Sequence, residues 1–281
     1  MNSSFPTNIF RDERSYHKHL DTNRQVQLIM LRMLLIVDFI CKKHDIRYWL
    51  IGGTLLGSVR HGGFIPWDDD IDIGMLRTDY DKFVKVFSKE APSDLFLQNF
   101  ESEDFYFNQT CPTKIRDRYS LFVEKHDRQF TKPFQQGIFL DIFPFDFQKQ
   151  RLFIRYFLKK RLKRLRKIIV SNRAGRLWGR SWCKLFSEEK IWTFHQWLLD
   201  KTIDPQSEIV DYGLDTAIKQ LRLPSTVFFP LKTTSFEGHI FPCPNDTSRY
   251  LRAKYGDYEK LPPEKARVPN HGQKVIPIYN P

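Results

Sequence analysis

The chain has 281 residues, enough for one large domain or two smaller domains with an extensive core. Its formal net charge is +12, and its four cysteines are scattered without CxxC spacing. That cysteine pattern argues against structural zinc and fits a reducing cytoplasm. The N-terminus shows no charged start followed by an apolar core and a small-residue cleavage site, so we expect no secretory signal and a cytoplasmic location.

The longest apolar stretch runs from residue 28 to residue 40. It is too short to span a bilayer, and Arg32 and Asp38 interrupt it. We therefore predict an amphipathic or buried helix over residues 22–43.

A short apolar run at residues 48–51 is typical of a buried strand, and Gly52 and Gly53 follow it at once. Residues 54–60 then predict a helix. The backbone N–H groups at a helix start attract anions, and glycines let a phosphate approach them closely. A glycine pair alone would favour an ordinary tight turn, but the acidic segment that follows favours a phosphate cradle.

That segment, PWDDDIDIG, places Asp68, Asp69, Asp70 and Asp72 within five positions. On a strand, three of them would share one face and Asp69 would take the other, so we expect Asp69 to be structural. Two carboxylates about 4 Å apart repel by roughly 1–4 kcal/mol in a surface-like dielectric, and a divalent cation relieves that cost. Oxygen ligands without His or Cys suit Mg2+ or Mn2+. The alternatives are a solvated turn or a calcium loop, although no glycine stands at the sixth position of such a loop.

The stretch GGTLLGSVRHGGFIPWDDDIDIGMLRTDYDKF, residues 52–83, resembles the signature of the LicD family, which includes the fukutin-related proteins. The resemblance continues in TKIRD at 113–117, GIFLDIFPFD at 137–146, and in FEGHIFPCP and YLRAKYGDYEKLPPE within 236–264. It implies a nucleotidyltransferase-like fold and transfer of a phospho-alcohol, such as phosphocholine, from a CDP-linked donor to a glycan hydroxyl. A nucleotidyltransferase acting on a sugar or alcohol phosphate, and an inactive membrane-associated module, are the alternatives.

The resemblance also implies roles for individual residues. The predicted catalytic residues are Asp70, Asp72 and Asp141, and the predicted metal ligands are these three with Asp68. Asp141 lies in an apolar strand pattern, where an unpaired carboxylate would be costly, and it is also a candidate general base. A strand-end helix cap or a structural ion pair is the other interpretation of Asp141. The predicted donor-binding residues are Gly52, Gly53, Thr54, Arg60, Lys114 and Arg116.

The pattern at Lys114 and Arg116 also has an explanation that involves no donor. Lys114 and Arg116 alternate along a predicted strand and share a face, where they could hold donor phosphates, but a solvated edge strand shows the same alternation.

Nine of the residues between Arg151 and Lys167 are Lys or Arg, and they alternate with an apolar stripe at helical spacing. A basic amphipathic helix over 151–169 could contact the inner face of a membrane and a lipid-linked acceptor, or it could pack on the domain with a solvated outer face. No recognition motif accompanies the charge, so nucleic acid is not an expected partner.

The elements together predict an α+β fold with a mixed sheet flanked by helices. We expect a single catalytic domain over 1–281, with a helical, basic insertion at 149–221. Strands around 228–241 are expected to rejoin the first sheet.

Overall fold

The computed structural model describes residues 11–103, 111–124, 134–148, 152–216, 218–269 and 271–278. A central sheet contains β1 (Trp49–Leu50), β2 (Asp72–Leu76), β6 (Phe139–Phe147), β4 (Thr113–Asp117) and β3 (Leu95–Asn99) in that order. β7 (Ile209–Tyr212) pairs with the second half of β6, and β8 (Leu223–Pro224) pairs with β7. Only β2 and β6 run parallel among the pairs of this sheet that the structure describes. The fold is therefore α+β with a mixed sheet, as predicted.

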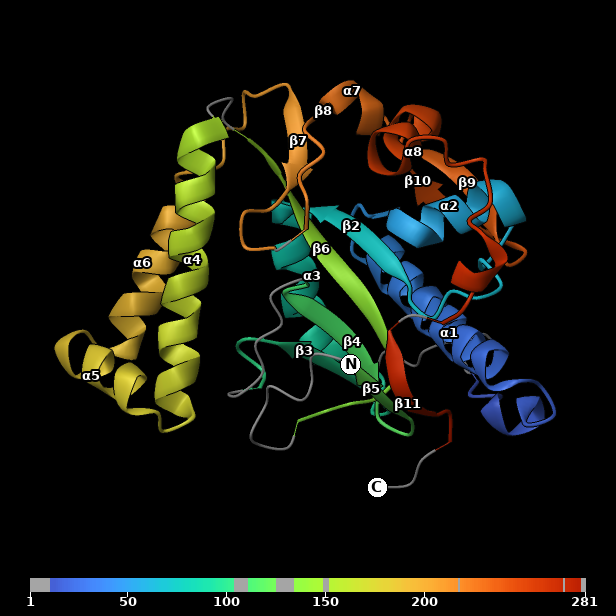
Figure 1. Ribbon diagram of the computed structural model, residues 1–281, viewed down its shortest axis with the longest axis horizontal. Coiled ribbons are helices and arrows are strands. Elements are labelled where there is room, and N and C mark those ends of the chain that lie inside the picture. Colours follow the sequence, from blue (N-terminus) through green and yellow to red (C-terminus); the bar gives the residue numbers. More distant parts are fainter. Residues whose placement is uncertain are drawn as a thin grey trace.

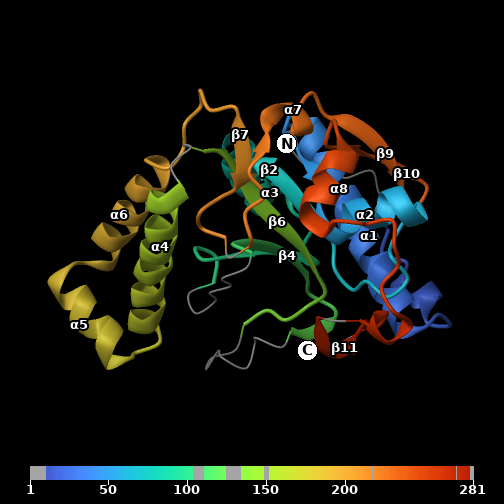
Figure 2. The same ribbon diagram turned by 45° about the horizontal axis from the view of Figure 1, so that its top comes forward.

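The helices lie around this sheet, with α1 (Thr22–Lys43), α2 (Gly52–His61) and α8 (Thr247–Tyr255) on one side (Figure 1, Figure 2). On the other side stand α4 (Leu152–Arg173), α5 (Leu177–Leu185) and α6 (Glu188–Asp200), which we call the helical arm. The remaining helices are α3 (Arg77–Glu90) and the short α7 (Ser225–Phe228), with 3-10 turns at Arg14–His17 and Glu264–Ala266. No helix in the described ranges is both long and apolar enough to cross a membrane.

The predicted N-terminal helix is confirmed over residues 22–43 as α1. Asp21 caps it by accepting a hydrogen bond from the Arg24 backbone N–H at 3.0 Å, which satisfies a donor that the helix itself leaves free. Its apolar face, which includes Met30, Met33 and Leu34, is buried in the main core with the strands of the sheet. Burial of that face, rather than contact with lipid, explains the apolar stretch.

Three expectations need correction. The strand β2 begins at Asp72, so Asp68 and Asp70 lie in the irregular segment before it and not on a strand. The strands β9 (Lys232–Phe236) and β10 (His239–Cys243) form a separate hairpin, because they pair with each other and not with the main sheet. Within the predicted insertion, the helices end at Asp200 and β7 already returns to the sheet.

A second small sheet pairs β5 (Leu121–Glu124) with β11 (Gly272–Ile276). This pairing brings the C-terminal segment back beside the centre of the chain. Its consequence for the site is the position of His271, which directly precedes β11.

Candidate active site

The strand register places three chemically active residues in one row. Asp72 is directly opposite Asp141 on the parallel strands β2 and β6, and Lys114 of β4 is opposite Asp141 on the other side. Neighbouring strands lie roughly 4.8 Å apart, so side chains at one register level meet on the same face. The Lys114 Nζ donates to Asp141 Oδ1 at 2.7 Å. The predicted pairing of Asp141 with the acidic segment is thus present in the fold.

The glycine pair lies against the acidic segment. Gly52 has φ +59°, and a Cβ atom at this position would overlap Asp72 Oδ2. A Cβ atom on Gly53 would stand 2.7 Å from Asp68 Oδ2. A side chain at either position would require the facing carboxylate to move, and the positive φ of Gly52 favours glycine there in addition.

Thr54 joins the same two elements. Its Oγ1 accepts a hydrogen bond from the Asp72 backbone N–H at 2.8 Å, and the side chain is buried. The Ile51 N–H donates to the Asp72 carbonyl at 3.2 Å. These two bonds hold the first turn of α2 next to the first residue of β2, so the described role of Thr54 is to position Asp72.

The carboxylates carry strong mutual repulsion. Burial, together with the neighbouring Asp72, raises the pKa of Asp68 to about 7. Burial and the charge of Asp68 raise the pKa of Asp70 to about 8. Burial and Asp70 raise the pKa of Asp72 well above its usual range, and burial also raises the pKa of Asp141. Groups with such shifts bind a cation favourably, because the cation removes the cost of keeping them ionised.

The donor chemistry of these oxygens fits Mg2+ or Mn2+. The described part of the chain nevertheless contains no group of three or more acidic, His or Cys side chains already gathered for coordination. The Asp141 carboxylate also forms an ion pair with Lys114. Metal binding at Asp68, Asp70, Asp72 and Asp141 therefore stays a prediction.

Lys254 is a site residue that sequence reasoning did not single out. Its Nζ would stand 3.3 Å from a Cβ atom on Gly52, and it donates to Tyr212 Oη at 3.0 Å. Burial lowers the pKa of Lys254, but the combined effect of Tyr250, Tyr255 and Asp72 is larger and raises it above its usual value. The ammonium group therefore stays charged. Tyr250 lies one helical turn before Lys254 on α8, and its hydroxyl accepts from the Gly52 N–H at 3.4 Å. The sequence feature that could have identified Lys254 is its i, i+4 spacing from Tyr250 within the block YLRAKY.

His271 is a second missed residue. Its ring Nδ1 is 2.7 Å from Asp69 Oδ1, and the backbone N–H groups of His271 and Gly272 both donate to the Asp69 carboxylate. The hydrogen bond with Asp69 raises the pKa of His271 to about 10. Asp69 therefore ties the C-terminal segment to the acidic segment, which agrees with the structural role predicted for it. His271 Nε2 also lies 3.5 Å from Asp70 Oδ2.

The cations of β4 are buried rather than solvated. Lys114 and Arg116 are 1% and 0% exposed, and both contact Glu124 and the ring of Phe139. Arg116 also donates to Gln98 Oε1 and to the Gly137 carbonyl, each at 2.8 Å. Their shared face is confirmed, and the edge-strand alternative is wrong because β4 lies between β3 and β6. These contacts give Arg116 a structural role, and its part in donor binding stays a prediction.

Arg60 lies at the other end of α2 from the glycines. It is half-buried, and its Nη1 donates to the Tyr258 carbonyl at 2.8 Å. Burial lowers the pKa of Arg60, and the charge of Asp68 opposes that shift. This contact also anchors the loop after α8 to α2.

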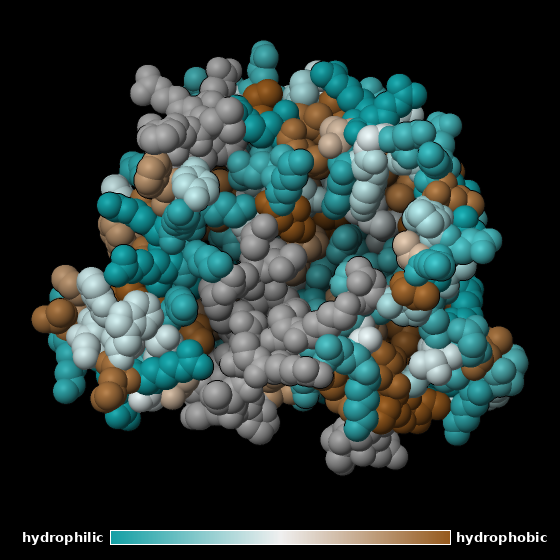
Figure 3. Space-filling model, viewed as in Figure 1, coloured by the Kyte–Doolittle hydropathy of each residue, from teal (hydrophilic) through white to brown (hydrophobic). Residues whose placement is uncertain are grey.

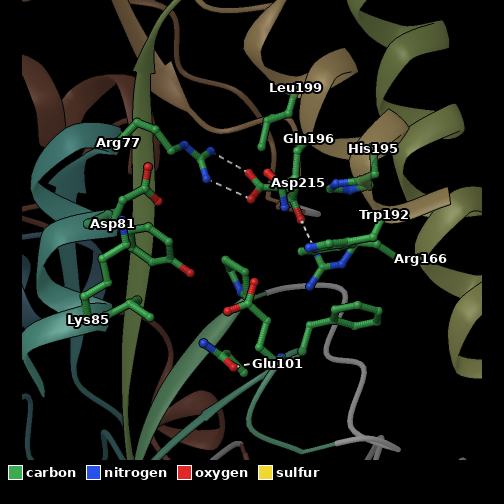
Figure 4. A pocket seen from close by; sticks show the side chains of 15 residues that line it. Arg77, Asp81, Lys85, Glu101, Arg166, Trp192, His195, Gln196, Leu199 and Asp215 are labelled. Carbon is green, nitrogen blue, oxygen red and sulfur yellow. Dashed lines mark hydrogen bonds and ion pairs between the residues drawn. The ribbon is translucent and has the colours of Figure 1, made fainter. Parts of the chain in front are cut away.

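A cavity of about 310 Å³ lies elsewhere, between α3, α4 and α6 (Figure 4). Arg77, at its wall, follows the last residue of β2, whereas Asp72 is the first residue of that strand. Arg77 makes paired bonds to both Asp146 and Asp215. His195 at the same wall is 1% exposed, and neither of its ring nitrogens finds a hydrogen-bond partner among the described residues. None of the predicted site residues is among the described residues that line this cavity.

Comparisons with known proteins agree with this arrangement. Residues 45–168 match the family model described as LicD/FKTN/FKRP, nucleotidyltransferase domain. The lipopolysaccharide cholinephosphotransferase LicD of Haemophilus influenzae is 29% identical over 271 residues, covering 90% of this chain and 97% of that protein.

Two shorter matches concern other proteins. The uncharacterized protein RP689 of Rickettsia prowazekii is 60% identical over 115 residues, or 34% of this chain and 42% of that protein. The human ribitol 5-phosphate transferase FKRP is 48% identical over 48 residues, or 17% of this chain and 10% of that protein. Residues 45–168 thus match a LicD-type nucleotidyltransferase domain, and the similarity to the Haemophilus protein extends along nearly the whole chain.

Proposed function

We propose that the protein is a metal-dependent phosphotransferase. It moves a phospho-alcohol, with phosphocholine as the first candidate, from a CDP-linked donor to a hydroxyl group of a cell-surface glycan such as lipopolysaccharide, teichoic acid or a capsule precursor. One observation carries the proposal: the Asp72 carboxylate faces the backbone of Gly52 at the start of α2, with the Lys254 ammonium beside both. The similarity to the Haemophilus protein along 90% of this chain supports phosphocholine as the first donor to test.

The residues divide the work of phosphoryl transfer among them. Gly52 and Gly53 let the donor diphosphate approach the first turn of α2, and Lys254 supplies a fixed positive charge there. Asp70 and Asp72 would hold Mg2+ or Mn2+, which would neutralise the charge that develops on the diphosphate. No covalent intermediate on the chain is required.

Asp141 is the proposed general base. Its carboxylate accepts from Lys114 at 2.7 Å, which holds it beside Asp72. A carboxylate held in this way can accept the proton of an acceptor hydroxyl that lies within hydrogen-bond reach. Burial raises the pKa of Asp141, and the bond to Lys114 opposes that rise, which favours the ionised state that a base needs.

The test is a donor panel with purified protein, Mg2+ and lipopolysaccharide as acceptor. CDP-choline, CDP-ribitol and CDP-glycerol are supplied in turn, and CMP release is measured by chromatography. We expect turnover with one donor and loss of at least 100-fold in Asp72→Asn, while Asp21→Asn, which changes an exposed cap of α1, keeps full activity. Equal turnover in Asp72→Asn, or no release from any donor, would overturn the proposal.

A nucleotidyltransferase is the alternative enzyme, because the same acids and metal cleave a phosphoanhydride in either reaction. It is tested in the same assay by supplying CTP with phosphocholine. Release of pyrophosphate rather than CMP identifies that activity. Donor binding without turnover identifies the inactive module.

A further inference from the structure

The net charge of the chain is confined to one segment. Residues 151–201 contain 15 Lys and Arg against 3 Asp and Glu, which is a formal charge of +12. The whole chain has 45 Lys and Arg and 33 Asp and Glu, so the other 230 residues contain 30 of each sign. From residue 152 onward, this segment consists of α4, α5, α6, the short links that join them and Lys201, which follows α6. The helical arm therefore carries the charge.

One face of α4 packs against α6 and against residues that follow β3 and β7. Leu162 and Ile169 are buried and Leu158 and Leu165 are half-buried, which confirms that part of the predicted apolar stripe; the side chain of Ile154 lies outside the described residues. Arg166, expected on the solvated face, is instead buried and donates to the Asp215 carbonyl at 3.2 Å. Lys159 donates to the Ile218 carbonyl at 3.0 Å. The inner side of α4 is therefore used for packing, and contact with a partner must use other parts of the arm.

The outer parts of the arm expose an unusual amount of apolar surface. Leu177 is 81% exposed and Leu185 is 76% exposed. Further exposed apolar side chains of the arm are Tyr156, Phe157, Trp178, Phe186, Phe194 and Trp197. Large apolar side chains gathered at a surface mark contact with a protein or a membrane more often than chance. Figure 3 shows brown groups beside teal ones at the tip of the arm.

The helix α5 orders these groups in two rows. Leu177, Ser181 and Leu185 follow at intervals of four, and so do Arg176, Arg180 and Lys184, all of them exposed. Residues four apart stack along one side of a helix, so an apolar row runs beside a basic row.

The opposite side of α5 is held by α4. A Cβ atom on Gly179 would overlap the backbone of Asn172, so α5 lies directly on α4 through this glycine. The two rows consequently face away from the protein. Figure 1 shows α5 at the end of the arm remote from the sheet.

We propose that this outer face of α5, formed by Leu177, Trp178, Leu185 and the basic row, docks on an anionic bilayer surface. A helix with leucine and tryptophan on one side and arginine and lysine next to them inserts its apolar groups at the headgroup level while its cations meet lipid phosphates. The inference deepens the proposed function, because a lipid-linked glycan acceptor is presented at that surface. It moves the contact from the α4 stripe at 151–169, where it was expected, to α5.

Two other occupants fit this face less well. A second copy of this chain would bury the leucines but would bring two charges of +12 together. A nucleic acid would match the charge, but it leaves the exposed leucines without a partner. An anionic bilayer satisfies both the apolar row and the basic row.

The experiment measures co-sedimentation of the full chain with vesicles, without donor or acceptor. We expect binding to vesicles of 30% phosphatidylglycerol in phosphatidylcholine and at least ten-fold weaker binding to phosphatidylcholine alone. The double variant Leu177→Glu/Leu185→Glu should lose at least ten-fold in binding to the anionic vesicles. The matched control Ile240→Glu/Val268→Glu adds the same charge at exposed apolar positions outside the arm and should bind as the wild type does.

Further readouts separate the alternatives. Trp178→Phe should remove most of the blue shift in tryptophan emission that vesicles cause. Equal binding to neutral and anionic vesicles, or unchanged binding of the Leu177→Glu/Leu185→Glu variant, would overturn the proposal. Conversion of an oligomer to a monomer by that variant, with vesicle binding unchanged, would assign the face to self-association. Transfer to a soluble acceptor should persist in the variant, so a failure here is distinct from a failure of the proposed function.

Discussion

Asp72 and Asp141 stand opposite each other on the only two parallel strands of the central sheet within the described residues, although 69 positions separate them in the chain. The Asp141 N–H donates to the Ile71 carbonyl at 2.8 Å, which fixes the register at the point where the acids meet. A shift of one residue would turn Asp141 to the other face of the sheet. The candidate site therefore depends on this pairing as much as on the acids themselves.

Removal of one acid should stop transfer without harming the fold. We expect Asp72→Asn to lower kcat by about 100- to 1,000-fold, the usual cost of deleting one group that stabilises developing charge. The melting temperature should stay equal or rise, because the substitution relieves repulsion with Asp70. Activity assays and thermal unfolding of the same preparation check both statements, and a large fall in melting temperature would show that Asp72 is structural.

Alanine substitutions at Gly52 and Gly62 can separate the effect of a Cβ atom beside Asp72 from the effect of backbone strain. Both have positive φ, but a Cβ atom overlaps Asp72 only at Gly52, while nothing lies within 4 Å at Gly62. Each Gly→Ala change should cost about 1 kcal/mol or more of stability from the backbone alone. We expect Gly52→Ala to lose at least ten-fold more activity than Gly62→Ala, as measured by CMP release; equal losses would remove the cradle from the mechanism.

Lys254 should act mainly on the donor. We expect Lys254→Met to raise the KM for the CDP-linked donor by ten-fold or more, because a fixed charge beside Gly52 is lost. Arg252→Met removes an exposed cation from the same helix and serves as the control. An unchanged KM with a lower kcat would instead place the lysine on the departing CMP.

Mg2+ should stabilise the wild type through the acidic segment. Binding to the folded state raises the melting temperature in proportion to the logarithm of ligand over Kd. We expect a rise with Mg2+, a larger rise with CDP-choline and Mg2+ than with CMP and Mg2+, and almost no rise with Mg2+ in Asp70→Asn/Asp72→Asn. A rise that survives in the double variant would place the metal elsewhere.

His195 should make the protein sensitive to mild acid. Burial lowers the pKa of His195 from 6.5 to about 3, so the unfolded chain binds a proton in a range where the folded chain does not. Its contribution to stability is complete above pH 6.5 and is lost as the pH falls toward 3, at about 2 kcal/mol between pH 7 and pH 5. Denaturant unfolding of the wild type and of His195→Phe at both values checks this; parallel curves would contradict it.

Local patterns in the sequence predicted several elements because their causes are local. The apolar periodicity before Lys43 defined α1, and the order of apolar run, Gly52, Gly53 and helix defined the start of α2. The acidic segment was correctly expected to face the glycines, since a short connection joins them. The error was to place Asp68 and Asp70 on the strand, because the alternation of Asp and Ile resembles a strand even where no partner strand is present.

The acids, the glycine pair and the basic segment were thus determined by the sequence itself, because composition and spacing suffice to recognise them. The tertiary structure decided which distant groups join them: strand register brought Asp141 to Asp72, α8 brought Lys254 to Gly52, and β11 brought His271 to Asp69. It also buried Arg116 and Arg166 while leaving Leu177 in solvent. Burial and long-range pairing depend on how whole elements pack, and no short window of sequence contains that information.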